Sequence, residues 1–94
     1  MSGLEATAQY QAARAVIARA LGVEVVAVEI FDDGTGRCTT TPAPASATPE
    51  ALRNIVAQNA DSVAAVAGEL VKRRRLTGVD IVRLLHEEEL GEAA

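Results

Sequence analysis

Hydrophobic residues recur at helical spacing over residues 4–21. The stripe consists of Tyr10, Ala13, Val16, Ile17, Ala20 and Leu21. Gly22 follows the stripe directly, and glycine favours the left-handed conformation found just past a helix end. The pattern predicts a first helix whose apolar face carries this stripe, with Gln11, Arg14 and Arg19 lying away from it.

Over residues 23–41 the hydrophobic period changes to two. Val26, Val28 and Ile30 alternate with other residues in a stretch rich in β-branched side chains. Asp33-Gly34 supplies the chemistry of a tight turn. The more polar segment 36–41 can return as an edge strand, so the sequence predicts a β-hairpin over 23–41.

A second helical stripe covers residues 48–75. Thr48 followed by Pro49 is a helix start, with a hydroxyl cap and proline in the first turn. The stripe consists of Leu52, Val56, Asn59, Val63, Val66 and Leu70. This spacing suits packing against another helix, either within the chain or across a dimer. Asp61 can start a new helix, so a break is expected near 59–62.

The last predicted helix covers residues 78–90. Thr77 can cap it, and Asp80 lies three residues on, where its side chain can accept a hydrogen bond from the Thr77 amide in return. Its apolar residues are Val79, Ile81, Val82, Leu84 and Leu85. The order is therefore helix, hairpin, helix, helix, which predicts one α+β domain spanning residues 1–94.

Composition limits the core and the partners. Apolar residues make up 49% of the chain but aromatic residues only 2%. A core of small side chains buries little area, so we expect a homo-oligomer or a bound protein partner. The net charge of −4 argues against nucleic acid and against an anionic membrane surface. No apolar run approaches the roughly 20 residues of a membrane span.

The single cysteine, Cys38, excludes an internal disulfide and fits a reducing compartment. The first residues lack the basic and apolar layout of a secretory signal. We therefore expect a cytoplasmic protein.

Two segments together resemble the peptidase domain of the FtsH-type AAA zinc metalloproteases. Residues 10–22, Tyr-Gln-Ala-Ala-Arg-Ala-Val-Ile-Ala-Arg-Ala-Leu-Gly, are similar to the HEAGHAVVARALG-type helix of that family. A valine-rich strand, an Asp-Gly turn and Gly36-Arg37-Cys38 follow in the family's order. Residues 59–80, with Leu76-Thr77-Gly78, are similar to its closing segment. The resemblance implies a small zincin-like α+β fold.

The same resemblance implies that the zinc chemistry is lost. A zincin helix needs two histidines at i and i+4 and a glutamate beside the first. Here Tyr10, Gln11 and Arg14 occupy those positions, and the segment 42–58 is too short to carry the helix of the third ligand. Arginine does not deprotonate to bind a metal. We expect no metal, no cofactor and no proteolysis.

Four further features each allow two interpretations. Arg14 can lie across the Tyr10 ring at the surface, or pair with a carboxylate such as Glu29 or one in 87–89. Residues 72–75, Lys-Arg-Arg-Arg, are a solvated helix end or a phosphate or nucleic-acid site. Cys38 is a half-buried strand cysteine or a nucleophile. His86 beside three glutamates is a surface residue or a metal ligand.

Two functions remain open from the sequence. The first is an inactive, zinc-peptidase-like interaction or regulatory module that uses the stripe from Leu52 to Leu70 and the exposed face of the last helix. The second is a small-ligand or anion-binding protein, or a non-zinc enzyme, that reuses a cleft around Tyr10, Gln11 and Arg14. A concave pocket lined by Tyr10 and Arg14 would favour the second.

Overall fold

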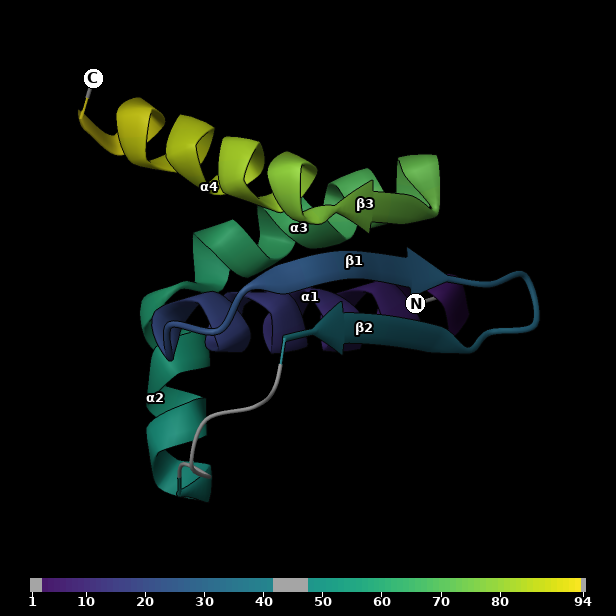
Figure 1. The fold of residues 1–94 in the computed structure, drawn as a ribbon, viewed down its shortest axis with the longest axis horizontal. Helices are drawn as coiled ribbons and strands as arrows, with labels where there is room; N and C mark the ends of the chain where they lie inside the picture. Colours follow the sequence, from purple (N-terminus) through teal and green to yellow (C-terminus); the bar gives the residue numbers. More distant parts are fainter. Residues whose placement is uncertain (1–2, 42–47, 94) are drawn as a thin grey trace.

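The fold is α+β, as predicted, with one additional strand (Figure 1). A computed structural model describes residues 3–41 and 48–93, with side chains up to residue 86. The predicted linker 42–47 lies outside the described residues. The elements are α1 (Gly3–Ala20), β1 (Val25–Ile30), β2 (Gly36–Thr40), α2 (Pro49–Gln58), α3 (Ala60–Arg73), β3 (Arg75–Thr77) and α4 (Gly78–Ala93).

The hairpin of β1 and β2 is confirmed, and β3 extends it to an antiparallel sheet with the order β2-β1-β3. β2 is an edge strand, as expected. β3 was not predicted from the sequence; its central residue Leu76 is fully buried opposite Val28. β1 is therefore the middle strand and is paired on both sides.

A register shift in β1 corrects the predicted face of that strand. The register of the pairing with β2 shifts between Val25 and Ala27, the kind of irregularity that a β-bulge produces. Val28 and Ile30 point into the core as predicted, but Val25 takes the place expected for Val26. Val26 is 51% exposed.

α1 and α3 lie behind the sheet and form a two-layer structure with it (Figure 1). The buried residues of α1 are Ala8, Gln11, Ala12, Ala15, Val16 and Ala18. The predicted apolar face of α1 was therefore wrong: of its six residues only Val16 is buried, and Tyr10 is 62% exposed. The face of α1 that carries the alanines is inside because small side chains let the backbones of neighbouring elements approach closely, and close packing fills the interior.

The predicted helix 48–75 is two helices, divided at Asn59 as expected. Asn59 has φ −120° and ψ 29°, and its Nδ2 donates a hydrogen bond of 2.7 Å to the Ile55 carbonyl oxygen. No side-chain cap from Asn59 to α3 is present. α3 lies in the core layer, whereas α2 projects from the body of the molecule (Figure 1).

The predicted helix caps and turn glycines are confirmed. Thr48 Oγ1 accepts a hydrogen bond of 3.1 Å from the Ala51 amide. Gly22 and Gly34 have φ of +80° and +90°, the conformations predicted for a helix end and a tight turn. Asp80 Oδ2 accepts from the Thr77 amide at 2.9 Å, and the Asp80 amide donates to Thr77 Oγ1 at 3.3 Å. This reciprocal cap starts α4, which extends beyond the predicted residue 90 to Ala93.

Candidate functional site

Tyr10 and Arg14, two of the three positions where the resemblance places a lost metal site, lie on the exposed side of α1. The Arg14 guanidinium stacks over the Tyr10 ring at 5.9 Å from the centroid. This is the surface contact expected from their spacing. Neither residue lines either of the two grooves described below. Neither of these two grooves is therefore the reused cleft that the sequence left open at these positions.

Gln11, the third position, is inside the protein. Its side chain is 4% exposed, and its Cγ would lie 2.9 Å from a Cβ added at Gly36. Gln11 Oε1 is buried and has no hydrogen-bond partner among the described residues. A buried amide carbonyl without a partner destabilises a fold. Gln11 thus faces β2 and not a solvent-filled cleft.

The proposed pairing of Arg14 with Glu29 is wrong. Glu29 lies directly opposite Arg37 on β2 and Arg75 on β3. Its carboxylate is 3.0 Å from Arg37 Nη2 and 3.9 Å from Arg75 Nε. Cross-strand pairs of opposite charge stabilise a sheet, so these arginines hold the carboxylate on the sheet. The alternative partners 87–89 lie outside the described side chains.

The basic run 72–75 is more than a solvated helix end. Arg73 pairs with Asp80 at 3.4 Å, and Arg74 pairs with Asp32 at 3.0 Å. Arg75 contacts Glu29, as described above. Arg74 also has a left-handed backbone, with φ 65°, and its carbonyl oxygen accepts a hydrogen bond of 2.9 Å from the Ile30 amide. The run therefore connects α3, the sheet and α4.

Cys38 is the half-buried strand cysteine of the first interpretation. Burial raises the pKa of its thiol, and the positive charge of Arg14 only partly opposes this effect. A raised pKa keeps the thiol protonated at neutral pH, which disfavours nucleophilic chemistry. His86 is exposed on α4.

Half of the predicted interaction stripe belongs to the core. Val63, Val66 and Leu70 are buried against the rest of the domain and are not accessible to a partner. The stripe suits helix packing within the chain, which was one of the two options left open. Leu52, Val56 and Asn59 remain partly exposed. Leu52 and Val56, with Ile17 of α1, line an α1–α2 groove of about 340 Å³.

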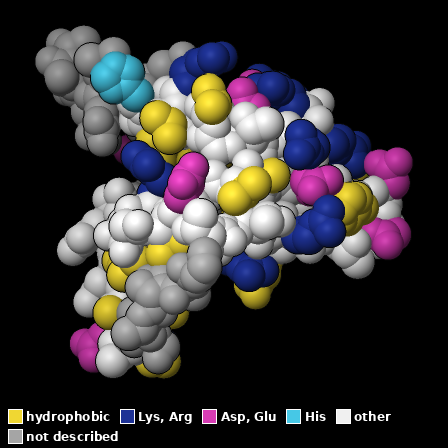
Figure 2. Space-filling view, viewed as in Figure 1, with side chains coloured by type: hydrophobic (Ala, Val, Ile, Leu, Met, Phe, Trp, Pro, Cys, Tyr) yellow, Lys and Arg dark blue, Asp and Glu magenta, His cyan; other side chains and the backbone are white. Residues whose placement is uncertain are grey.

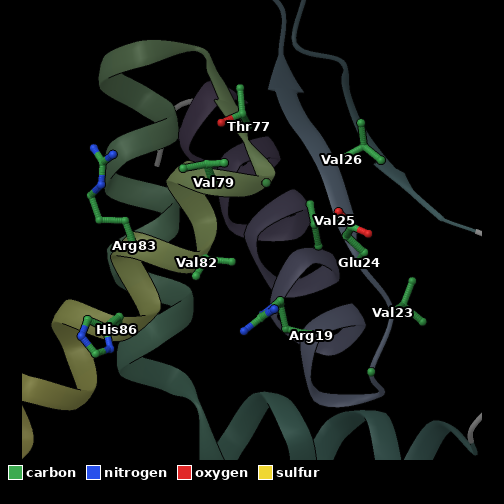
Figure 3. Close-up of a pocket in the computed structure, with 12 residues that line it drawn as sticks. Arg19, Val23, Glu24, Val25, Val26, Thr77, Val79, Val82, Arg83 and His86 are labelled. Atoms are coloured by element: carbon green, nitrogen blue, oxygen red, sulfur yellow. The ribbon is translucent and has the colours of Figure 1, made fainter.

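A larger groove lies where α4 leaves the sheet. It has a volume of about 860 Å³, and we call it the β1–α4 groove. Its walls are the end of α1, the start of β1 and the first turns of α4 (Figure 3). The side chains that shape it are Arg19, Val26, Val79, Val82, Arg83 and His86. Arg19 points from α1 toward α4, and Val82 points from α4 into the space between them (Figure 3).

The local structure explains why the groove is open and apolar. Gly78 packs so closely on Val25 that an added Cβ would overlap the Val25 carbonyl oxygen. α4 therefore begins against β1 and then diverges from it. The bulge in β1 places Val26 outside the core on one side, and Val79 and Val82 of α4 lie on the other. These two valines are 68% and 46% exposed.

The reciprocal cap at the head of α4 fixes the position of this helix. Hydrogen bonding from the Thr77 amide lowers the pKa of the Asp80 carboxyl below its usual 3.8, and Arg73 adds to the effect. Asp80 is therefore ionised at neutral pH and accepts from Thr77 while it pairs with α3. The groove wall is held by charge-assisted hydrogen bonds.

Two properties of the described residues bear on the class of protein. No three histidine, cysteine, aspartate or glutamate side chains among them lie close enough together to hold a metal ion. None of their helices has the length and apolar character needed to cross a membrane. Comparison with known proteins gives no relative: no family model, curated protein or solved structure matches this chain.

Proposed function

We propose that this protein is a catalytically inactive, zinc-peptidase-like module that acts by binding another protein, in a reducing compartment such as the cytoplasm. The observation that carries the proposal is the β1–α4 groove. It gathers three valines that are each about half exposed or more. Isolated exposed valines are ordinary, but an apolar groove of this size on so small a domain is typical of a contact surface.

The surface proposed here differs from the one that the sequence favoured. The exposed face of the last helix is retained, since Val79 and Val82 belong to it. The stripe from Leu52 to Leu70 is reduced to its first half, because its second half is core. Figure 2 shows hydrophobic side chains beside the histidine, on the part of the molecule where α4 lies.

The donor set at the former metal positions supports inactivity. Tyr10, Gln11 and Arg14 do not fit zinc, because arginine stays protonated and the Gln11 amide is buried under β2. A reused cleft at these residues is not proposed, because Tyr10 and Arg14 lie on the outside of α1.

The test compares capture of partners from the native cell by matched variants. Val79→Ser combined with Val82→Ser removes the apolar wall at exposed positions, and Tyr10→Ser is the control for loss of an exposed apolar side chain elsewhere. We expect the wild type and Tyr10→Ser to retain the same partner and the groove variant to lose it. Equal recovery by all three proteins would contradict the proposal.

Self-association is measured on the same proteins by size-exclusion chromatography with light scattering. A dimer that becomes a monomer in the groove variant would identify a second copy as the partner. Inactivity is tested by metal analysis of the purified protein. Zinc at one equivalent per chain would overturn this part of the proposal.

A further inference from the structure

We propose that the occupant of the β1–α4 groove is a short peptide segment of a partner protein that carries aliphatic side chains flanked by carboxylates. This inference rests on the proposed function and adds the chemistry of the ligand. It follows from two independent properties of the groove, its row of valines and its excess of positive charge.

The side of the groove that α4 forms has the length of a short segment. Val79, Val82, Arg83 and His86 follow at i, i+3, i+4 and i+7 and so lie along one side of α4. This row spans about 10 Å, or two helical turns. Val26 of β1 also lines the groove. Two or three aliphatic side chains of a bound segment can cover these valines and remove them from water.

The charge around the valines is positive although the chain as a whole is acidic. Arg19 and Arg83 line the groove together with one carboxylate, Glu24. Within residues 3–41 and 48–86, neither arginine forms an ion pair. By contrast, Arg37, Arg73, Arg74 and Arg75 all have carboxylate partners on or beside the sheet.

The two arginines come from different walls of the groove, Arg19 from α1 and Arg83 from α4. Arg19 is directed toward α4, and the Arg83 side chain lies on the side of α4 that is turned away from α1 (Figure 3). Carboxylates that flank an aliphatic stretch of a bound segment would meet one arginine on each side. Such complementarity orients a segment and excludes a basic one. A nucleic-acid ligand fits less well, because the residues that line the groove include no phenylalanine, tyrosine or tryptophan for stacking against bases.

The experiment is a selection of random dodecapeptides displayed on phage, with the full chain as bait. The groove variant Val79→Ser with Val82→Ser serves for counter-selection. We expect enriched peptides that combine leucine, isoleucine or valine with aspartate or glutamate, and that do not bind the groove variant. This result supports both the ligand chemistry and the proposed function.

Two other outcomes separate the inference from the proposed function. Enriched peptides that need the groove valines but carry no excess of acid would overturn the inference and leave the interaction function standing. A selection that yields no peptide dependent on the groove valines would contradict both. Acidic peptides that bind equally well after loss of the valines would also overturn the inference, because charge alone would then explain binding.

The charges are then tested by titration with one enriched peptide, followed by fluorescence anisotropy. Arg19→Gln combined with Arg83→Gln should weaken binding about tenfold at low salt. Arg53→Gln, an exposed arginine on α2, is the matched control and should leave the affinity unchanged. Raising the ionic strength from about 0.05 to about 0.5 M should weaken the wild type and not the double variant. Equal affinity of the wild type and the double variant at low salt would overturn the charge argument.

Discussion

α2 and α3 continue one hydrophobic stripe, yet they use it in opposite ways. In α3 the stripe residues Val63, Val66 and Leu70 are buried against the rest of the domain. In α2 no residue is buried, although Leu52 and Val56 continue the same spacing toward the N-terminus. The turn at Asn59 separates the two helices, so that one lies in the core layer and the other projects (Figure 1). A heptad-like pattern therefore shows that a helix has an apolar side, but not whether its own chain covers that side.

The largest expected effect comes from truncating the same residue type in both helices. Leu70→Ala removes a fully buried side chain and should lower the free energy of unfolding by about 3 kcal/mol. Leu52→Ala, at a partly exposed position of α2, should cost about 1 kcal/mol or less. Urea denaturation followed by circular dichroism measures both. Equal losses would show that α2 packs as deeply as α3.

A second substitution tests Gln11, a polar residue buried in the core layer. Gln11→Met keeps the volume of the side chain and removes the buried Oε1 that lacks a partner. We expect the protein to become more stable by about 1 kcal/mol. Gln9→Met, at an exposed position of the same helix, should change stability by less than about 0.5 kcal/mol. A loss of stability in Gln11→Met would mean that the amide makes a contact that the fold requires.

The cap of α2 separates local from global stability. Thr48→Ala removes the hydroxyl that accepts from the Ala51 amide and should destabilise α2 by about 1 kcal/mol. Because α2 contributes no buried residue, the amides of α2 should exchange with solvent faster while those of α3 keep their protection. Hydrogen exchange measured by NMR gives both values. Thr48→Ser retains a hydroxyl and should behave as the wild type. If the amides of α2 and α3 lost protection equally in Thr48→Ala, the two helices would unfold as one cooperative unit, which would contradict this prediction.

The smallest expected effect is a loss of stability at acidic pH, and it comes from Asp80, which pairs with Arg73 at the end of α3. Asp80, which pairs with Arg73, has a folded-state pKa below its usual 3.8, so the folded protein binds fewer protons than the unfolded chain. The stability that it contributes is present above about pH 5 and is lost as the pH falls through 3.8 and below. Asp80→Asn keeps an acceptor for the Thr77 amide and loses the charge. We expect the wild type to have the higher Tm at pH 6, and the difference between the two values to shrink as the pH falls below 3.8; a constant difference would contradict this.

The parts of the fold that the sequence predicts correctly depend on local chemistry. The turn at Gly34, the cap at Thr48 and the pair Thr77 and Asp80 each form within a few residues of chain. Each of these signals is complete in the sequence, because the groups that satisfy one another are neighbours.

The errors arise where contacts between residues far apart in the sequence determine the structure. β3 has three residues, too few to show a period, and it exists because Leu76 completes the core beside Val28. The predicted buried side of α1 was wrong because alanine is only weakly hydrophobic. The larger apolar residues Tyr10 and Leu21 therefore determined the predicted face, although the alanines are the buried residues. The β1–α4 groove is lined by both Arg19 and His86, and no local pattern connects residues so far apart in the sequence.

The late position of β3 in the chain has a consequence for synthesis. β1 and β2 are neighbours in sequence, but residues 41–74 must follow before β3 can pair with β1. Until then, the hairpin that has left the ribosome presents Ala27, Val28, Glu29 and Ile30 along an unpaired strand edge. Such an edge is a template for pairing with another chain. The edge is therefore closed only after the three residues of β3 have been synthesised, and any stop before Arg75 would release a chain with that edge open.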